Sequence, residues 1–199
     1  MRLPEEEVWY NFRQGDIGSF EWIYDQYAKL LFQYCKQYCN SQALVEDCIQ
    51  ELFTELWEKR ANLGPTTSIK FYLLSSIRRK LARKLQQENK RHLFEGANEL
   101  PAFQTIATPE SILILSEEEK LLQATLLQAV NELPVRQREV LYLRYFQGLS
   151  FEEIAEITSL PRKTTYNIMY LALDTLRKKL SITSDIGFMT LLVSVLSRS

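Results

Sequence analysis

Apolar side chains recur at intervals of three and four residues along most of this chain, which is the spacing of one face of an α-helix. One such stretch lies between about Ser19 and Arg60, and within it a second helix is expected from Ala43 to Lys59. Asn40 or Ser41 is a plausible N-cap for that helix. With only six glycines in 199 residues and many straight-chain residues, the chain is predicted to be all-α.

An acidic segment divides the sequence. Residues 92–119 contain six glutamates, two prolines and no Lys or Arg, which is typical of a linker. We therefore predict two small helical domains, residues 1–91 and 120–182, followed by an apolar tail at 183–199. Within the second domain, Pro134, Gly148 and Pro161 should separate three or four short helices.

Positive charge is concentrated in one predicted helix. The formal net charge of the chain is −1, yet residues 70–91 hold eight basic residues and one acidic residue, a local charge of +7. A cationic helix face of this kind suits a nucleic-acid backbone. A solvated basic face with no ligand is the alternative interpretation.

Residues 147–161 have the pattern of a helix-turn-helix. Ser150 and Glu153 form an S-x-x-E capping box, which starts a helix with Ile154, Ala155 and Ile157 facing inward. A turn at residues 158–160 then leads into a second helix from about Arg162, the element that enters the major groove in such motifs. A helical hairpin without DNA contact remains the alternative.

Several classes of function are excluded. The chain has one histidine, no phosphate-binding glycine loop and no metal-ligand spacing, so we expect no enzyme, no cofactor and no metal. Cys35, Cys39 and Cys48 are expected to be reduced thiols buried in helices of a cytoplasmic protein. The apolar run at residues 186–196 is about half as long as a membrane span requires, and a short docking helix is expected there.

Three segments together resemble a known family. Residues 131–155 (NELPVRQREVLYLRYFQGLSFEEIA) resemble region 4 of sigma-70 factors. Residues 43–59 (ALVEDCIQELFTELWEK) resemble region 2.2, and residues 71–80 (FYLLSSIRRK) resemble the start of regions 2.3 and 2.4. Two such regions with only a linker between them resemble the ECF group, over residues 19–180. The resemblance implies a bacterial transcription initiation factor that binds core RNA polymerase and directs it to promoters.

The resemblance also implies which residues make the contacts. The clamp helices of the polymerase largest subunit would dock on an exposed apolar stripe with a charged rim, formed by Asp47, Gln50, Glu51, Phe53, Leu56 and Trp57. For the apolar members of this set, a place in the hydrophobic core is the alternative. Binding and melting of the minus-10 element would fall to Lys70, Phe71, Tyr72, Arg78, Arg79, Lys80, Arg83, Lys84, Lys90 and Arg91. Region 4 would contact the flap of the second-largest subunit, and DNA through Arg138, Arg162, Lys163, Thr164, Asn167, Tyr170, Arg177 and Lys178.

The sequence departs from the family pattern in the recognition helix. Tyr166, Ile168 and Leu171 stand where polar or basic groups are common, and Lys80 stands where the family commonly has Asn. We therefore hypothesise that the minus-35 element is read weakly and that another DNA-bound protein, for example an RNA-guided one, helps to recruit this factor. An anti-sigma factor is left open as a further partner. The competing interpretation is a stand-alone helix-turn-helix regulator that acts without polymerase.

Overall fold

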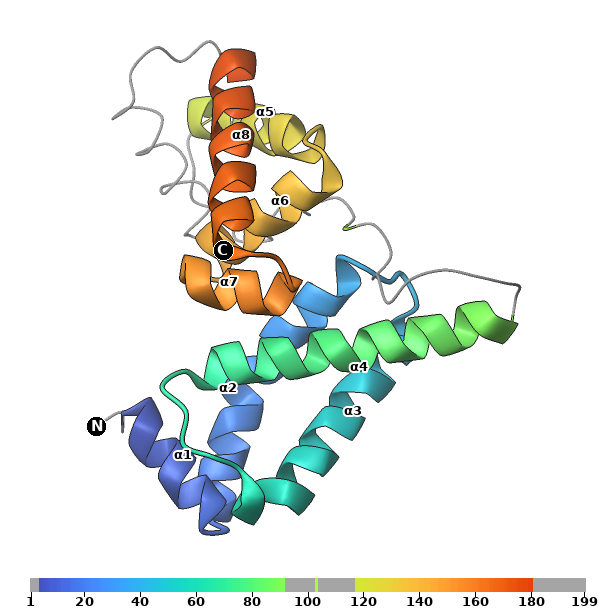
Figure 1. The fold of residues 1–199 in the computed structure, drawn as a ribbon, viewed down its shortest axis with the longest axis vertical. Helices are drawn as coiled ribbons and strands as arrows, with labels where there is room; N and C mark the ends of the chain where they lie inside the picture. The colour runs from blue at the N-terminus through green and yellow to red at the C-terminus, as the bar shows by residue number, and fades with distance from the viewer. Residues whose placement is uncertain (1–3, 92–102, 104–116, 181–199) are drawn as a thin grey trace. The chain divides into compact units, whose positions relative to one another are not determined.

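The computed structural model describes residues 4–91, 103 and 117–180. The chain forms two compact units, residues 1–102 and 103–199, and each is treated by itself below. The described residues form helices and turns and contain no strand, so the predicted all-α class with two helical domains is confirmed (Figure 1). Most of the predicted linker and the tail at 183–199 lie outside the described residues, and the predicted domain boundaries stay predictions.

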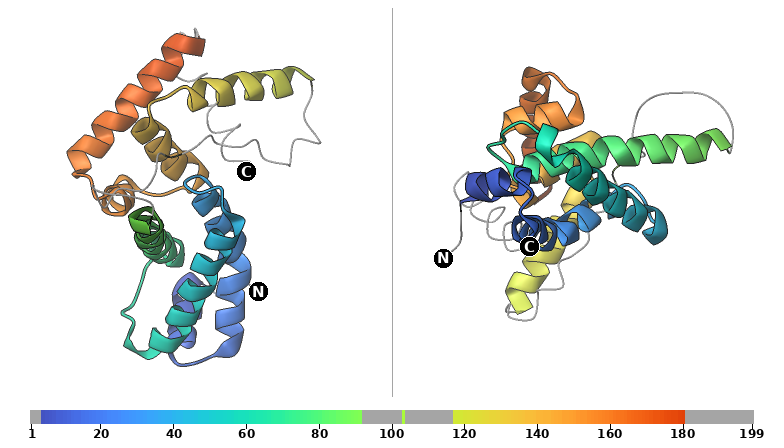
Figure 2. Two further views of the ribbon diagram at one scale, coloured as in Figure 1. Left: turned by 90° about the vertical axis from the view of Figure 1, so that its right-hand side faces the viewer. Right: turned by 90° about the horizontal axis from the view of Figure 1, so that it is seen from below.

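The first unit contains α1 (Glu5–Arg13), α2 (Ile17–Lys36), α3 (Gln42–Lys59) and α4 (Ile69–Arg91), with a 3-10 turn at Arg60–Asn62. Helix α2 packs against the other three, and α4 lies across α2 and α3 (Figures 1 and 2). The Ser41 hydroxyl accepts a hydrogen bond from the Leu44 amide at 3.3 Å, which confirms the predicted N-cap of α3. The hydrophobic core between these helices contains fully buried side chains that include Ile23, Leu31, Leu73, Leu74, Ile77 and Leu81.

Helix α1 was not predicted from the sequence. Its first turn is acidic, which suits the positive end of a helix dipole, and its apolar residues Val8, Trp9 and Phe12 are buried. The Trp9 indole donates a hydrogen bond to the Gly64 carbonyl at 2.9 Å. The Glu5 carboxylate accepts hydrogen bonds from the Ile69 amide at 3.3 Å and from the Tyr27 hydroxyl at 2.7 Å. Helix α1 therefore ties the start of α4 to the rest of the unit.

The second unit is built from α5 (Glu117–Asn131), α6 (Val135–Leu141), a π-helical turn at Tyr142–Phe146, α7 (Phe151–Thr158) and α8 (Arg162–Leu180). Helix α8 packs against α5, α6 and α7. The predicted breaks at Pro134, Gly148 and Pro161 each lie between helices. Helix α5 begins at Glu117, inside the segment predicted as linker.

The helix-turn-helix prediction is confirmed in detail. Both hydrogen bonds of the Ser150–Glu153 capping box are present, at 2.7 and 3.2 Å, and Ile154, Ala155 and Ile157 are buried. Ser159 ends α7 in the left-handed conformation, with φ 55° and ψ 33°. This single left-handed residue redirects the chain into α8.

Ser159 gives a direct test of this turn. A left-handed conformation costs a residue with a Cβ atom about 1 kcal/mol, and glycine escapes most of that cost. We expect Ser159→Gly to raise the stability of the second unit by about 0.5–1 kcal/mol, and Ser159→Val to lower it by at least that much. Urea unfolding followed by far-ultraviolet circular dichroism measures the change. All three tryptophans, at positions 9, 22 and 57, lie in the first unit, so an unchanged tryptophan transition is the control.

The three cysteines are free and buried, as predicted, although Cys39 lies in the turn after α2 rather than in a helix. Burial raises the pKa of the Cys48 thiol to about 11, which keeps it protonated at neutral pH. Among the described residues, no cluster of His, Cys, Asp or Glu is able to hold a metal ion. None of the described helices has the length and apolar character that crossing a membrane requires.

Candidate nucleic-acid interface

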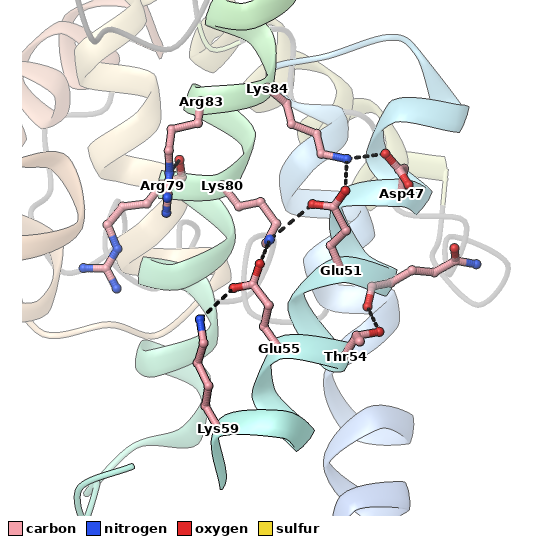
Figure 3. Close-up of polar contacts among 10 residues, drawn as sticks. Asp47, Glu51, Thr54, Glu55, Lys59, Arg79, Lys80, Arg83 and Lys84 are labelled. Carbon is pink, nitrogen blue, oxygen red and sulfur yellow. Dashed lines mark hydrogen bonds and ion pairs between the residues drawn. The ribbon is translucent and has the colours of Figure 1, made fainter. Parts of the chain in front are cut away.

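The cationic side of α4 is split between two directions (Figure 3). Lys80 and Lys84 point at α3, and their side chains are only 11% and 18% exposed. The Lys80 ammonium lies 3.2 Å from the Glu51 carboxylate and 2.6 Å from that of Glu55. The Lys84 ammonium lies 2.6 Å from Glu51 and also pairs with Asp47. Four ion pairs thus join the two helices.

These contacts form a closed set of charges. Lys59 adds a contact of 3.6 Å to Glu55, so three ammonium groups face three carboxylates. We call this set the α3–α4 network, with members Asp47, Glu51, Glu55, Lys59, Lys80 and Lys84. Because its formal charges cancel, it adds no net charge to the surface that it occupies.

The network shifts the protonation equilibria of its members. The hydrogen bond from Lys84 lowers the pKa of Glu51, and the hydrogen bond from Lys80 lowers the pKa of Glu55. Burial opposes the charged form of Lys84, but its hydrogen bonds with Asp47 and Glu51 outweigh burial and leave its pKa raised. Glu51, Glu55 and Lys84 are therefore charged over the whole neutral range.

The network predicts acid sensitivity of the first unit. A carboxylate whose folded pKa is lowered adds stability that is complete above its unfolded pKa of about 4.3 and is lost as the pH falls through the folded value. Glu51 and Glu55 are about half exposed, at 45% and 48%, so we expect less than about 1 kcal/mol from each pair. Urea unfolding between pH 7 and 3.5, followed by tryptophan fluorescence, measures the loss.

The control for this prediction is Lys80→Met, which keeps an apolar stem of similar length and removes the charge. Its stability should change less than that of the unmodified chain over the same pH range, because two hydrogen bonds to carboxylates are gone. Identical pH profiles for the two proteins would contradict a stabilising role for the network.

The network and the core correct the predicted binding residues. Asp47 and Glu51, predicted as a polymerase-facing rim, pair with Lys80 and Lys84, predicted as DNA contacts. Phe53 and Leu56 are only 3% exposed and belong to the core, so the prediction of an exposed stripe through them is wrong. Trp57 is half-buried, with its ring 5.1 Å from Phe20 and the Arg60 guanidinium stacked on it at 4.1 Å. The regular spacing of apolar residues in α3 therefore arises because these residues pack in the core, and it does not mark an exposed surface.

Arg79 and Arg83 project from α4 on the side away from the network (Figure 3). Both are exposed, and the Arg83 Nε donates to the Arg79 carbonyl at 3.3 Å. They border a hollow between α3 and α4, which we call the α3–α4 hollow. Its lining also includes Leu52, Leu56, Tyr72 and Ser76, together with network members Glu55, Lys59 and Lys80. Exposed cations thus lie beside an aromatic ring and the apolar side chains of Leu52 and Leu56.

Four other residues predicted to bind DNA in the first unit are less exposed than Arg79 and Arg83, namely Lys70, Phe71, Tyr72 and Arg78. Lys70, Phe71 and Arg78 are half-buried, and the Arg78 guanidinium lies 5.9 Å from the Tyr38 ring. The Tyr72 ring packs 5.2 Å from that of Trp9. Lys90 and Arg91 lie in α4, but their side chains are outside the described part of the chain.

A second hollow lies between α2 and α3, and sequence reasoning missed most of it. Tyr24, Ala28 and Phe32 line it from α2 at intervals of four, with Ile49 and Gln50 from α3 and with Lys29 and Glu46 at its edge. We call it the α2–α3 hollow. Tyr24 is 44% exposed although its ring lies 4.8 Å from Phe53. The repeat of apolar residues at 24, 28 and 32 was the available signal.

In the second unit, the residues predicted to read DNA lie on α8. Arg162, Lys163, Asn167 and Tyr170 are exposed and Thr164 is half-buried. Arg162 pairs with Glu152 and contacts the Tyr166 hydroxyl at 3.4 Å, and the Tyr166 ring stacks on Phe151 at 4.1 Å. The ion pair and the ring stack join α8 to α7.

The remaining predicted contacts of the second unit are partly engaged within the protein. Arg138 is half-buried and donates to the Leu133 carbonyl at 3.2 Å. Lys178 pairs with Asp174 at 2.7 Å, while Arg177 is half-buried. Four of the residues predicted to contact DNA are therefore exposed together in the first half of α8. Arg138 instead packs within the unit.

Comparison with known families agrees with this geometry. The family model described as Sigma-70 region 2 matches residues 23–91, and the one described as Sigma-70, region 4 matches residues 123–176. The chain belongs to the sigma-70 family of RNA polymerase sigma factors, and within it to the ECF group. The resemblance inferred from the sequence is confirmed.

Curated relatives extend the match over most of the chain. ECF RNA polymerase sigma factor BldN of Streptomyces coelicolor is 26% identical over 170 residues, which cover 83% of this chain and 62% of that protein. RNA polymerase sigma-H factor of Pseudomonas aeruginosa is 24% identical over 84% of this chain and 89% of that protein. SigV of Bacillus subtilis is 27% identical over 78% of this chain and 84% of that protein.

Solved structures show the same fold. CnrH, solved in complex with the cytosolic domain of CnrY, has a TM-score of 0.56 at 17% identity and covers 92% of this chain and 100% of its own. RpoE of Bartonella quintana, solved in complex with the anti-sigma factor NepR, has a TM-score of 0.57 at 17% identity and covers 84% of this chain and 100% of its own.

Proposed function

We propose that this sigma factor binds core RNA polymerase, directs it to promoters and melts the minus-10 element. The observation that carries the proposal is the division of the cations of α4, in which Lys80 and Lys84 lock the helix to α3 and leave Arg79 and Arg83 free to face a ligand. A rigid helix with outward arginines is preorganised for a nucleic-acid backbone. This role needs no reaction at the chain's own residues, in keeping with the prediction that it is not an enzyme.

The α3–α4 hollow suits an opened DNA strand. Single-stranded nucleic acid is bound by cations that follow the phosphates and by aromatic or apolar surfaces that receive unstacked bases. Arg79 and Arg83 supply the first kind of group, and Tyr72 with the apolar floor supplies the second. Lys80 and Lys84 act here by positioning α4 rather than by contacting DNA.

The α2–α3 hollow is the better candidate for the clamp helices of the largest subunit. An exposed aromatic ring in a hollow with a charged edge concentrates binding energy in a few residues. Tyr24 and Phe32 supply the aromatic groups, and Gln50, one of the residues predicted to contact polymerase, also lines this hollow. The flap of the second-largest subunit is the proposed partner of the second unit.

Weak reading of the minus-35 element remains part of the proposal. Arg162 and Lys178 pair with carboxylates of their own unit, so forming a phosphate or base contact must compete with those pairs. Recruitment by another DNA-bound protein, for example an RNA-guided one, would supply the missing specificity. Because CnrH and RpoE were each solved with a partner protein, an anti-sigma factor is a further candidate partner.

Reconstitution with core polymerase tests this function. The chain should bind core polymerase and give defined transcript starts, whereas a stand-alone regulator would bind duplex DNA and leave core polymerase unbound. Tyr24→Ala should weaken polymerase binding by about tenfold or more, because truncating an anchoring aromatic costs at least about 1.4 kcal/mol. Tyr10→Ala is the matched control, since Tyr10 is 59% exposed and outside the α2–α3 hollow. Equal losses in both variants would contradict docking at this hollow.

A further inference from the structure

Helix α8 carries a short row of exposed side chains on one side. Lys163, Asn167 and Tyr170 are exposed and follow one another at intervals of four and three residues, so they lie on the same face of the helix. Tyr170 is 70% exposed, more than any other large apolar side chain of the described residues. We call these three residues the α8 row. It extends for about 10 Å along the helix, which is the length of about three base-pair steps of DNA.

The basic and aromatic groups beside the α8 row are engaged within the second unit. Arg162 pairs with Glu152, and the Tyr166 ring stacks on Phe151 with the ring centroids 4.1 Å apart. The Arg162 guanidinium lies 5.6 Å from the Tyr166 ring. These contacts direct both side chains to α7, whereas the α8 row faces solvent.

An ion pair marks the end of the α8 row. Asp174 follows Tyr170 by one turn on the same face of the helix. The Lys178 ammonium lies 2.7 Å from the Asp174 carboxylate, so the pair adds no net charge to this face. The face therefore changes beyond Tyr170 from single exposed groups to a neutral pair.

Each side chain of the α8 row matches a group that DNA presents in its major groove. The Asn167 amide has a donor and an acceptor, as bidentate binding to the N6 and N7 atoms of adenine requires. The Tyr170 ring is an apolar surface, and the 5-methyl group of thymine is the apolar group that base pairs present there. The Lys163 ammonium suits guanine or a phosphate. Two of the three side chains thus favour adenine–thymine pairs.

We propose that α8 recognises adenine–thymine pairs, with Asn167 bound to an adenine and Tyr170 in contact with the 5-methyl group of a thymine. The inference rests on the proposed function, in which α8 reads the minus-35 element, and it names the bases that the helix selects. A methyl contact needs no charge, so it suits a helix whose Arg162 is already paired with a carboxylate. Selection through one amide and one ring is limited, which agrees with weak reading of the element.

Removal of single methyl groups from DNA tests the contact of Tyr170. Duplexes are selected from a random pool by the full chain, both alone and in complex with core polymerase. Each thymine of a selected duplex is then replaced by deoxyuridine, which removes only the 5-methyl group and keeps the base pair. At one or more positions the affinity should fall about fourfold, the change expected when one methyl group loses its apolar contact.

Variants assign the methyl effect to the ring of Tyr170. Tyr170→Ala should bind the thymine and deoxyuridine duplexes equally at this position, whereas Tyr170→Phe should keep the difference. Leu171→Ala is the matched control, because Leu171 is 50% exposed but lies about 100° away from Tyr170 around the helix. It should keep the difference as well. A methyl effect that persists in Tyr170→Ala, or none in the unmodified chain, would overturn the proposal.

A change in adenine tests the contact of Asn167. Replacing the selected adenine by 7-deazaadenine removes the N7 acceptor and keeps the base pair. The affinity of the unmodified chain should fall about fivefold or more, because a bidentate amide contact is worth at least that factor. Asn167→Ala should bind both duplexes equally. Equal binding by the unmodified chain at every adenine would refute the role of Asn167.

Binding of core polymerase separates the two possible failures. A chain that does not bind core polymerase would refute the proposed function, while its methyl effect as a free protein would still be decided by the same duplexes. A chain that binds core polymerase and gives defined transcript starts, but shows no methyl effect, would refute only the reading by α8. A pool from which neither form of the protein enriches a thymine-containing sequence would refute that reading in the same way.

Discussion

The first unit should lose about 3–5 kcal/mol of unfolding free energy when Trp9 is replaced by Ala. Trp9 is 2% exposed, its ring packs 5.3 Å from Phe12 and 5.2 Å from Tyr72, and its indole donates to the Gly64 carbonyl. The substitution leaves a large cavity and removes the hydrogen bond to the Gly64 carbonyl. Urea unfolding followed by the fluorescence of Trp22 and Trp57 measures the loss.

Two further variants divide this effect into its parts. Tyr10→Ala changes the neighbouring residue of α1, which is 59% exposed, and should cost less than about 0.5 kcal/mol. Trp9→Phe keeps an aromatic ring but removes the donor to Gly64, so it should fall between the two. A loss in Trp9→Ala no larger than that in Tyr10→Ala would show that α1 is not part of the cooperative core.

The second large effect is expected on promoter opening. Replacing both Arg79 and Arg83 by Glu should lower the formation of open complexes at least about tenfold, because two phosphate contacts become repulsions. The plot of log affinity against log salt should become shallower by about two. Permanganate reactivity of unpaired thymines, measured with reconstituted holoenzyme on a promoter found by start-site sequencing, reports the opening.

The matched control changes the two cations of α4 that face α3 in place of the two that face solvent. Replacing Lys80 and Lys84 by Met should lower stability, since both bind carboxylates of α3, but should change the salt dependence little. Both double variants should bind core polymerase normally because neither set of residues lines the α2–α3 hollow. An equal loss of salt dependence in the two double variants would show that the lysines also reach DNA.

Most of the helices were predictable because their signals are local. The spacing of apolar residues gave α2, α3 and α4, and the caps at Ser41 and Ser150 fixed two of the starting points. Helix α1 was missed because it is only nine residues long, and a run of three glutamates hides its short apolar face. A short helix is held by its packing rather than by its own pattern.

The site was harder to predict because it depends on which way charged side chains point. Arg79 and Lys80 are neighbours in sequence, yet one turns to solvent and the other to α3 (Figure 3). Both residues are simply basic in the sequence, so the sequence alone does not show which of them faces solvent. A readable signal did exist, since carboxylates at 47, 51 and 55 match lysines at 80 and 84 in a four-residue repeat. It becomes informative only once the two helices are known to pack together.

Helix α3 lines both the α2–α3 hollow and the α3–α4 hollow. Glu46, Ile49 and Gln50 border one hollow, and Leu52, Glu55 and Leu56 border the other, on a single helix of 18 residues. Between the hollow faces, α3 is joined to α4 by two ammonium groups, each bound by two carboxylates. Ligands bound in the two hollows would therefore contact one and the same helix, so each would bind next to the residues that hold the other.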